Sequence, residues 1–184
     1  MTRQLGPTDL KRLNRSWRRR LGGRAALVLD GVAQPYNLGS ILRSAAALGV
    51  ETVWLTEAGT DPRHPSSRKL SMGTEHNLVW EQKATAVDAV AAARAEGYRI
   101  IAVELARDAT PIHETDLSGD VCLVLGHEDH GCAAATLAAV DTCVFIPQPG
   151  KVGSLNVAVA AAIALSELRR QGWMQDDAID QPDP

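Results

Sequence analysis

Three short clusters of polar residues follow apolar, strand-like runs in this chain, and each can present functional groups to a ligand. The first contains Asn37 and Arg43, the second contains Glu128 in a loop bracketed by glycines, and the third contains Ser154 and Asn156. A glycine-bracketed loop can expose backbone N–H groups together with one carboxylate. Such positions are typical of a site for a nucleotide-like ligand or of a catalytic group.

The third cluster separates a strand from a buried helix. The run 144–146 is apolar and β-favouring, and Pro147 ends it because proline cannot donate to a strand ladder. From Asn156 onward the chain is apolar on every face, which indicates a helix buried on all sides. The apolar run is well short of the roughly 20 residues that a bilayer requires, so no membrane span is predicted.

Apolar runs alternate with helical segments of about ten residues, which predicts an α/β fold with a parallel, doubly wound sheet and helices on both faces. Ligands of such sheets bind beyond the carboxyl ends of the strands. Because all three polar clusters follow predicted strands, we expect them at one edge of the sheet. The predicted strands are Ala25–Leu29, Thr52–Leu55, Asn77–Glu81, Arg99–Val103, Val121–Leu125 and Thr142–Ile146.

Two predicted helices bear on function. Asn37 is a good N-cap for a helix that stops at Gly49, and the segment 56–67 is expected to be a polar loop. Near the N-terminus, apolar residues recur at helical spacing until Gly22-Gly23, with basic residues opposite. This basic helix fits contact with a polyanion, although a solvated helix face has the same pattern. Its candidate contact residues are Arg12, Arg15, Arg18, Arg19 and Arg20.

The three clusters resemble, in order and spacing, the motifs of the SpoU family of RNA ribose 2′-O-methyltransferases. The first motif, Asn-Leu-Gly followed by an arginine and a small-residue helix ending in Leu-Gly-Val, is matched by residues 37–50. The second, Gly-x-Glu-x-x-Gly, is matched by residues 126–131, although His127 stands where asparagine is expected. The third, with Ser-Leu-Asn at its centre, is matched by residues 146–160.

This resemblance implies a SPOUT-type fold in which the segment from about residue 125 to 165 forms a deep trefoil knot. It also implies S-adenosylmethionine bound in the knot and a homodimer whose active site uses both chains. Three regions are expected: a basic helical extension at 1–24, the methyltransferase domain at 25–173, and an acidic, disordered tail at 174–184.

By resemblance, Arg43 is the first catalytic candidate. An arginine side chain stays protonated and makes a poor base, so we expect Arg43 to clamp a phosphate and stabilise the developing alkoxide. Ser154 and Asn156 would orient Arg43 and the substrate or simply cap a helix. Asn37 would fix its loop, and Glu128 would hold the ribose or Arg43 unless it is a solvated loop carboxylate. The residues implied to line the cofactor pocket are Val103, Gly126, Ile146 and Leu155.

The expected activity is methylation of a ribose 2′-hydroxyl in RNA. Guanosine 18 in the D-loop of tRNA is the first choice, because the arginine-rich helix, Trp173 and the Ser71-x-Gly73 segment resemble the tRNA-methylating branch. Ribosomal RNA, the tRNA wobble ribose and an inactive RNA-binding paralogue remain alternatives. A nicotinamide-dependent enzyme would carry GxGxxG after the first strand, and residues 30–39 contain none.

The cysteines and histidines indicate whether disulfide bonds or a metal site are to be expected. Cys122, Cys132 and Cys143 are odd in number and lack CxxC spacing, so neither a disulfide framework nor a zinc site is expected. The histidines also lack a set of partners suited to a metal. No apolar segment follows the N-terminal charges, so we expect no signal peptide and a cytoplasmic protein with reduced thiols.

Overall fold

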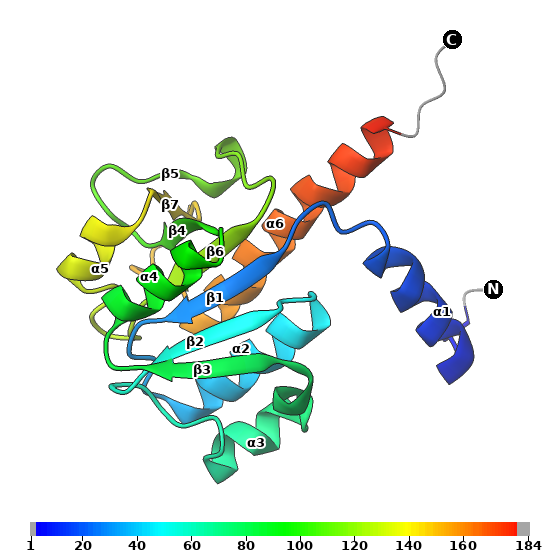
Figure 1. Ribbon diagram of the computed structural model, residues 1–184, viewed down its shortest axis with the longest axis horizontal. Coiled ribbons are helices and arrows are strands. Elements are labelled where there is room, and N and C mark those ends of the chain that lie inside the picture. Colours follow the sequence, from blue (N-terminus) through cyan, green and yellow to red (C-terminus); the bar gives the residue numbers. More distant parts are fainter. Residues whose placement is uncertain (1–2, 180–184) are drawn as a thin grey trace.

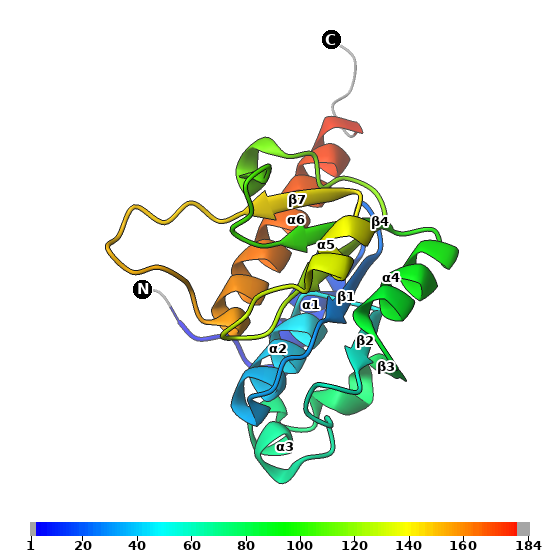
Figure 2. The same ribbon diagram turned by 90° about the vertical axis from the view of Figure 1, so that its left-hand side faces the viewer.

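A fully parallel, seven-stranded sheet organises the chain (Figures 1 and 2). The structure is a computed structural model that describes residues 3–179. The strand order is β3-β2-β1-β6-β4-β7-β5, which confirms the predicted parallel α/β fold. The strands are β1 (Ala25–Leu29), β2 (Thr52–Thr56), β3 (Val79–Lys83), β4 (Arg99–Val103), β5 (Thr110–Pro111), β6 (Val121–Leu125) and β7 (Thr142–Phe145).

Helices cover both faces of the sheet, as Figures 1 and 2 show. Helices α2 and α6 pack on one face, α4 and α5 pack on the other, and α3 packs against α2. The helices are α1 (Pro7–Arg18), α2 (Pro35–Ala47), α3 (Pro65–Ser71), α4 (Ala86–Ala95), α5 (Ala134–Ala139) and α6 (Val157–Ile179). Two short 3₁₀ helices, η1 (Thr74–Asn77) and η2 (Ile112–Glu114), complete the described elements.

The central strands are apolar on both faces because helices cover both of them. Along β1, Ala25, Leu27 and Leu29 lie in the core on the α2–α6 face, whereas Ala26 and Val28 lie in the core on the α4 face. All five residues of neighbouring β6 are also buried. The pair β1–β6 is therefore a rigid centre from whose carboxyl ends the site loops leave.

Several predicted boundaries were wrong. Helix α2 begins at Pro35 with Gln34 as its N-cap, so Asn37 is not the cap but lies in the first turn. Pro35 suits the first helical position because its fixed φ is already helical and no N–H is needed there. Part of the expected loop 56–67 belongs to α3, and the predicted strand 77–81 is displaced to β3 because η1 occupies its start.

The C-terminal prediction was also wrong for part of its range. Helix α6 continues to Ile179, so residues 174–179 are helical, whereas residues 180–184 lie outside the described residues. The predicted trefoil knot is not tested by the strand order and stays a prediction. Among the helices that the structure describes, none is long and apolar enough to cross a membrane.

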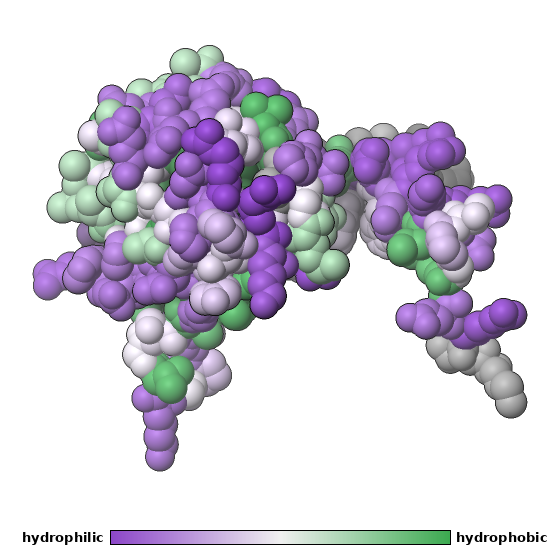
Figure 3. All heavy atoms as spheres, turned by 90° about the horizontal axis from the view of Figure 1, so that it is seen from below, coloured by the Kyte–Doolittle hydropathy of each residue, from purple (hydrophilic) through white to green (hydrophobic). Residues whose placement is uncertain are grey.

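Helix α1 forms an arm beside the body of the protein (Figures 1 and 3). None of its residues is buried, and its apolar residues Leu10, Leu13 and Trp17 are 40–48 % exposed. The arm touches the body through Trp17, whose ring lies 4.9 Å from that of Trp173 on α6. The helix thus presents an apolar face and an arginine face to its surroundings.

The glycine pair after α1 has a different role from the predicted helix stop, because α1 already ends at Arg18. A Cβ atom on Gly22 would lie 2.6 Å from the carbonyl oxygen of Gly172 on α6, which is too close for any side chain. Gly22 therefore allows the chain to pass α6 closely, and Gly23 allows it to pass the backbone of Gly119 before it enters β1.

Candidate functional site

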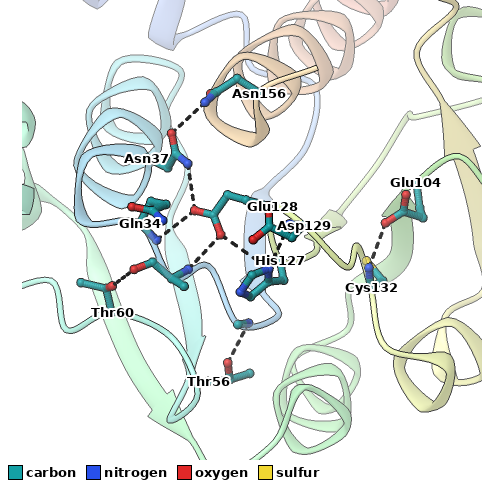
Figure 4. Close-up of polar contacts among 12 residues, drawn as sticks. Gln34, Asn37, Thr56, Thr60, Glu104, His127, Glu128, Asp129, Cys132 and Asn156 are labelled. Atoms are coloured by element: carbon teal, nitrogen blue, oxygen red, sulfur yellow. Dashed lines mark hydrogen bonds and ion pairs between the residues drawn. The ribbon is translucent and has the colours of Figure 1, made fainter. Parts of the chain in front are cut away.

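The three polar clusters meet at the carboxyl edge of the sheet, as predicted. Glu128, in the loop after β6, reaches the segment between β1 and α2. Its carboxylate accepts hydrogen bonds from the backbone N–H groups of Ala33 (3.0 Å) and Gln34 (2.9 Å) and from Asn37 Nδ2 (2.8 Å). Figure 4 shows these groups converging on the carboxylate. Because β1 and β6 are neighbours, this contact spans little distance in space although it links segments more than 90 residues apart.

Hydrogen bonds favour the charged form of Glu128. Burial by itself would raise the pKa of this carboxyl group, but the hydrogen bonds from Asn37, Ala33 and Gln34 outweigh burial and lower the pKa below its ordinary value. The carboxylate also lies at the N-terminus of α2, where the helix dipole favours a negative charge. Glu128 is therefore a fixed anion that positions the start of α2, not a solvated loop carboxylate.

Asn37 connects Glu128 to the third cluster. Its Oδ1 accepts a hydrogen bond from Asn156 Nδ2 at 2.9 Å. Asn156 in turn caps α6, because its Oδ1 accepts from the N–H groups of Ala158 (2.9 Å) and Val159 (3.3 Å). We call the chain Glu128–Asn37–Asn156 the amide relay (Figure 4). The relay joins one residue from each motif and ties the N-termini of α2 and α6 together.

A pocket of about 340 Å³ opens beside the relay, at the lower end of the size range for small-molecule sites. All four residues implied for the cofactor, Val103, Gly126, Ile146 and Leu155, line it. The lining combines apolar walls with backbone groups from three loops and contains no lysine or arginine.

The charges at the pocket also fit the cofactor. Three acidic residues line it, namely Glu104, Glu128 and Asp129. This arrangement suits S-adenosylmethionine, which has a flat apolar base, hydrogen-bonding groups and a cationic sulfonium.

The loop at 126–131 forms one wall of this pocket. His127 and Gly131 exchange two backbone hydrogen bonds of 3.0 and 2.9 Å, which closes the loop into a tight turn. Gly131 has a φ of +67°, which an L side chain rarely adopts. His127, which stands where the family motif has asparagine, accepts a hydrogen bond from the N–H of Asp129 through Nδ1 (3.0 Å) and stacks on His130 at 4.8 Å. The ring therefore stabilises its own loop.

The other two catalytic candidates are exposed and lie outside the relay. Arg43 is on α2, two turns from Pro35, and forms no hydrogen bond or ion pair among residues 3–179. Ser154 lines the pocket but likewise has no hydrogen-bond partner within this range. The structure of one chain thus does not bring Arg43 into contact with Ser154 or Asn156. The roles predicted for these two residues stay predictions.

Sequence reasoning missed Glu104, which directly follows β4 and lines the pocket. Its Oε2 accepts a hydrogen bond from the N–H of Cys132 at 2.8 Å. The signal available in the sequence was its place: it is the first residue after Val103, at the carboxyl end of a buried strand. Across the part of the chain that the structure describes, no group of three His, Cys, Asp or Glu residues is placed to bind a metal.

A second, larger groove of about 900 Å³ runs between α2 and α6 on the other side of the relay. Asn37 and Asn156 line it together with apolar residues that are unusually exposed: Tyr36 (58 %), Val159 (48 %) and Ile163 (39 %). The arginines of α1 lie elsewhere, on the arm. Of the predicted RNA contacts, Arg12, Arg15, Arg18 and Arg19 are exposed, while the guanidinium of Arg20 lies 4.7 Å from the Trp17 ring.

Residues 24–166 match the sequence profile of the SpoU rRNA Methylase family, and this range contains the sheet, the relay and the pocket. The chain belongs to this family. It is 36% identical to the 23S rRNA (guanosine-2′-O-)-methyltransferase RlmB of Acinetobacter baylyi over 79% of this chain and 59% of that protein. It is 34% identical to the tRNA (guanosine(18)-2′-O)-methyltransferase of Escherichia coli K12 over 78% of this chain and 62% of that protein.

A solved structure of an AdoMet-bound rRNA methyltransferase from Sinorhizobium meliloti matches with a TM-score of 0.73 and 30% identity, over 81% of this chain and 57% of that one. The fold of this SpoU-family chain is thus the fold of known RNA methyltransferases. The chain spans about three fifths of the length of the curated relatives that it matches.

Proposed function

We propose that this protein is an S-adenosylmethionine-dependent RNA methyltransferase that modifies a ribose 2′-hydroxyl. The observation that carries this proposal is the amide relay, which joins the three motif clusters beside a pocket of suitable size. The names of the relatives support the reaction class, since both are 2′-O-methyltransferases. An inactive RNA-binding paralogue would have no need for an intact relay next to a cofactor pocket.

The cofactor supplies a methyl group on a cationic sulfonium, which the ribose 2′-oxygen attacks. The new bond would join that oxygen to the methyl carbon, and the electron pair of the broken carbon–sulfur bond would stay on sulfur. The hydroxyl proton would pass to an oxygen of a neighbouring RNA phosphate. Arg43 would hold this phosphate and stabilise the negative charge that develops on the 2′-oxygen. The relay fixes the helix that carries Arg43, and Ser154 would orient the nucleotide.

Transfer RNA, with guanosine 18 as the target, is the proposed substrate. The arginine face of α1 supports an RNA partner, because exposed arginines spaced along one helix can bind successive phosphates. Ribosomal RNA is a second candidate, favoured by the 36% identity to an enzyme that acts on 23S rRNA. The Ser71-x-Gly73 segment does not separate the two, because it follows from the end of α3 and does not line the cofactor pocket.

The proposed active form is a homodimer in which a second copy of this chain covers the groove between α2 and α6. The apolar side chains of Tyr36, Val159 and Ile163 lie exposed along this groove. A partner bound there would also bring groups close to Arg43 on α2, which forms no hydrogen bond or ion pair within residues 3–179. Substituting Val159→Asp should therefore yield a monomer in sedimentation velocity and abolish turnover together.

The deciding experiment incubates the protein with labelled S-adenosylmethionine and with unmodified tRNA or ribosomal RNA, followed by nucleoside mass spectrometry. A 2′-O-methylguanosine found only in tRNA would support the proposal in full. Label only in ribosomal RNA would keep the reaction and replace the substrate. Absence of label from both RNAs, with cofactor bound, would contradict the proposed activity.

The role of α1 has its own test. Removing residues 1–20 should weaken RNA binding and flatten its salt dependence. Each phosphate contact releases about one counterion, so each lost contact lowers the slope of log K against log salt by about one. Binding of the cofactor, whose pocket lies at the opposite part of the fold, should not change. A salt slope equal to that of the full chain would contradict contact between α1 and RNA.

A further inference from the structure

Glu104 provides a second carboxylate to the pocket, and its hydrogen bonds use only part of its capacity to accept. Its Oε1 accepts from the N–H of Leu105 (3.0 Å) and its Oε2 from the N–H of Cys132 (2.8 Å). An ionised carboxylate has about four acceptor positions, so one on each oxygen remains available. No lysine or arginine of residues 3–179 forms an ion pair with it. The half-buried carboxylate lines the pocket with unused acceptor capacity.

The surroundings of Glu104 hold this carboxylate in place before any ligand arrives. Gly131 lies against it so closely that a Cβ atom at residue 131 would collide with Glu104 Oε2. The backbone of β4 fixes one side, and the turn 126–131 with Cys132 fixes the other. Such preorganisation lowers the entropy lost when a ligand binds. It also distinguishes Glu104 from the exposed carboxylate of Asp108 in the same loop.

The position of Glu104 within the pocket selects the part of the ligand that it meets. Figure 4 shows Glu104 well apart from the relay residues Glu128, Asn37 and Asn156, beyond the turn that carries His127. The methyl group must be presented on the relay side, where Arg43 and the RNA would lie. The ribose of the cofactor lies between its sulfur and its adenine, away from the methyl group. A carboxylate with one free acceptor on each oxygen matches a vicinal diol, which donates two parallel hydrogen bonds.

We propose that Glu104 binds the 2′- and 3′-hydroxyls of the cofactor's ribose and thereby sets the affinity of the pocket for adenosyl ligands. This inference rests on the proposed function, because it assumes an adenosyl cofactor in this pocket. Both oxygens keep their backbone hydrogen bonds while each accepts one hydroxyl of the ribose. A site built to bind hydroxyl groups rejects an analogue that lacks them, since its polar groups are then left unpaired.

The test is a cycle that combines a variant with a changed ligand. Isothermal titration calorimetry would measure the binding of S-adenosylhomocysteine and of its 2′,3′-dideoxy analogue to the wild type, to Glu104→Gln and to Glu104→Ala. For S-adenosylhomocysteine, both variants should bind about 10- to 100-fold more weakly, the usual range for hydrogen bonds to a charged group. For the dideoxy analogue, wild type and variants should bind with similar, weak affinity. Asp108→Asn, which removes an exposed carboxylate of the same loop, should behave like the wild type.

Each other outcome overturns the inference. If the variants lose the same factor for both ligands, Glu104 only supports the turn. If the loss is greater for S-adenosylmethionine than for S-adenosylhomocysteine and independent of the hydroxyls, Glu104 acts on the sulfonium charge. Equal binding of S-adenosylhomocysteine to all proteins would show that Glu104 has no role. If the wild type binds neither cofactor form, the proposed function fails, a result separate from all of these; melting curves without ligand identify any variant that does not fold.

Discussion

The two ends of helix α2 are held by opposite charges from distant parts of the chain, with different consequences. At its N-terminus, Glu128 accepts hydrogen bonds from two backbone N–H groups and from Asn37. At its C-terminus, Arg169 donates to the carbonyl oxygens of Leu48 (2.7 Å) and Gly49 (2.7 Å), and it also donates to that of Gly23 (2.8 Å), which precedes β1. Both charges complement the helix dipole. Only Glu128, however, lies at the pocket.

The two edges of the sheet also differ in how their charged side chains are paired. At the amino edge, Asp120 and Asp141 pair with Arg24 (2.8 Å) and Arg94 (2.7 Å), as is common in structural ion pairs. At the carboxyl edge, the carboxylate of Asp30 accepts from the N–H of Ala133 at 3.0 Å, and Glu104 and Glu128 likewise accept from backbone amides. Within residues 3–179, none of these three has a lysine or arginine partner. These two aspartates at the amino edge are thus neutralised by arginines, whereas Glu104 and Glu128 at the carboxyl edge line the pocket without such a partner and can face a cationic cofactor.

Loss of Arg169 should have the largest effect on stability. This side chain is only 2 % exposed, burial lowers the pKa of its guanidinium, and it satisfies three carbonyl oxygens. Arg169→Met would leave these oxygens unpaired and should cost about 3–5 kcal/mol of unfolding free energy, since each orphaned group costs about 1–3 kcal/mol. Urea unfolding measures this loss. Arg170→Met, next to it but exposed, should have a far smaller effect.

Only the N-terminal end of α2 is expected to affect the pocket. This expectation would be contradicted if the folded variant Arg169→Met bound the cofactor much more weakly than the wild type. At temperatures where the variant is folded, a change at the C-terminal end of the helix should lower the unfolding free energy but leave the cofactor affinity unchanged. A matching loss of cofactor affinity would show that α2 transmits its position from one end to the other.

Loss of Arg43 should have the largest effect on catalysis. Because Arg43 is exposed on α2 and has no hydrogen-bond or ion-pair partner among the described residues 3–179, Arg43→Ala should leave stability and cofactor affinity nearly unchanged. Turnover should fall by about 10²–10³-fold or more, the usual cost of removing one group that stabilises developing negative charge. Single-turnover methylation with saturating RNA measures this loss. Retained activity would contradict the assignment, and Arg107→Ala, at another exposed arginine, is the matched control.

Glu128→Gln sharpens the contrast between the two edges. A glutamine has one acceptor oxygen and an NH₂ group that would face donors, so at least one of the backbone N–H groups of Ala33 and Gln34 loses its partner. We expect about 1–3 kcal/mol of lost stability and a drop in turnover, because Asn37 and Asn156 lose their anchor. Glu114→Gln, at an exposed carboxylate, should change neither. A stability loss without any change in turnover would mean that the relay serves the fold alone.

The parts of this molecule that the sequence predicted are those determined by local pattern. The strands β1, β4 and β6 coincide with their predicted ranges, because each is a short apolar run between turn residues. The start of α2 was misplaced because its cap is not local: Glu128, more than 90 residues away, satisfies the amides there. Glu104 escaped notice for the same reason, since its role depends on Cys132, which follows another strand. Polar side chains with partners on distant segments thus mark the limit of prediction from periodicity and spacing.

The smallest expected effect lies at the amino edge, in the ion pair of Asp120 with Arg24. Hydrogen bonds from Arg24, first from its backbone N–H, lower the pKa of Asp120, but the side chain is 38 % exposed and water screens the pair. Asp120→Asn should therefore cost less than about 1 kcal/mol at neutral pH. Because a lowered pKa stabilises the fold only above the ordinary range of aspartate, near 4, the difference from wild type should vanish as the pH falls through the lowered pKa. Urea unfolding between pH 7 and pH 3 measures this trend, and cofactor affinity should not change at any pH where the protein is folded. A loss that grew towards acid would show that the amino edge depends on more than paired charges.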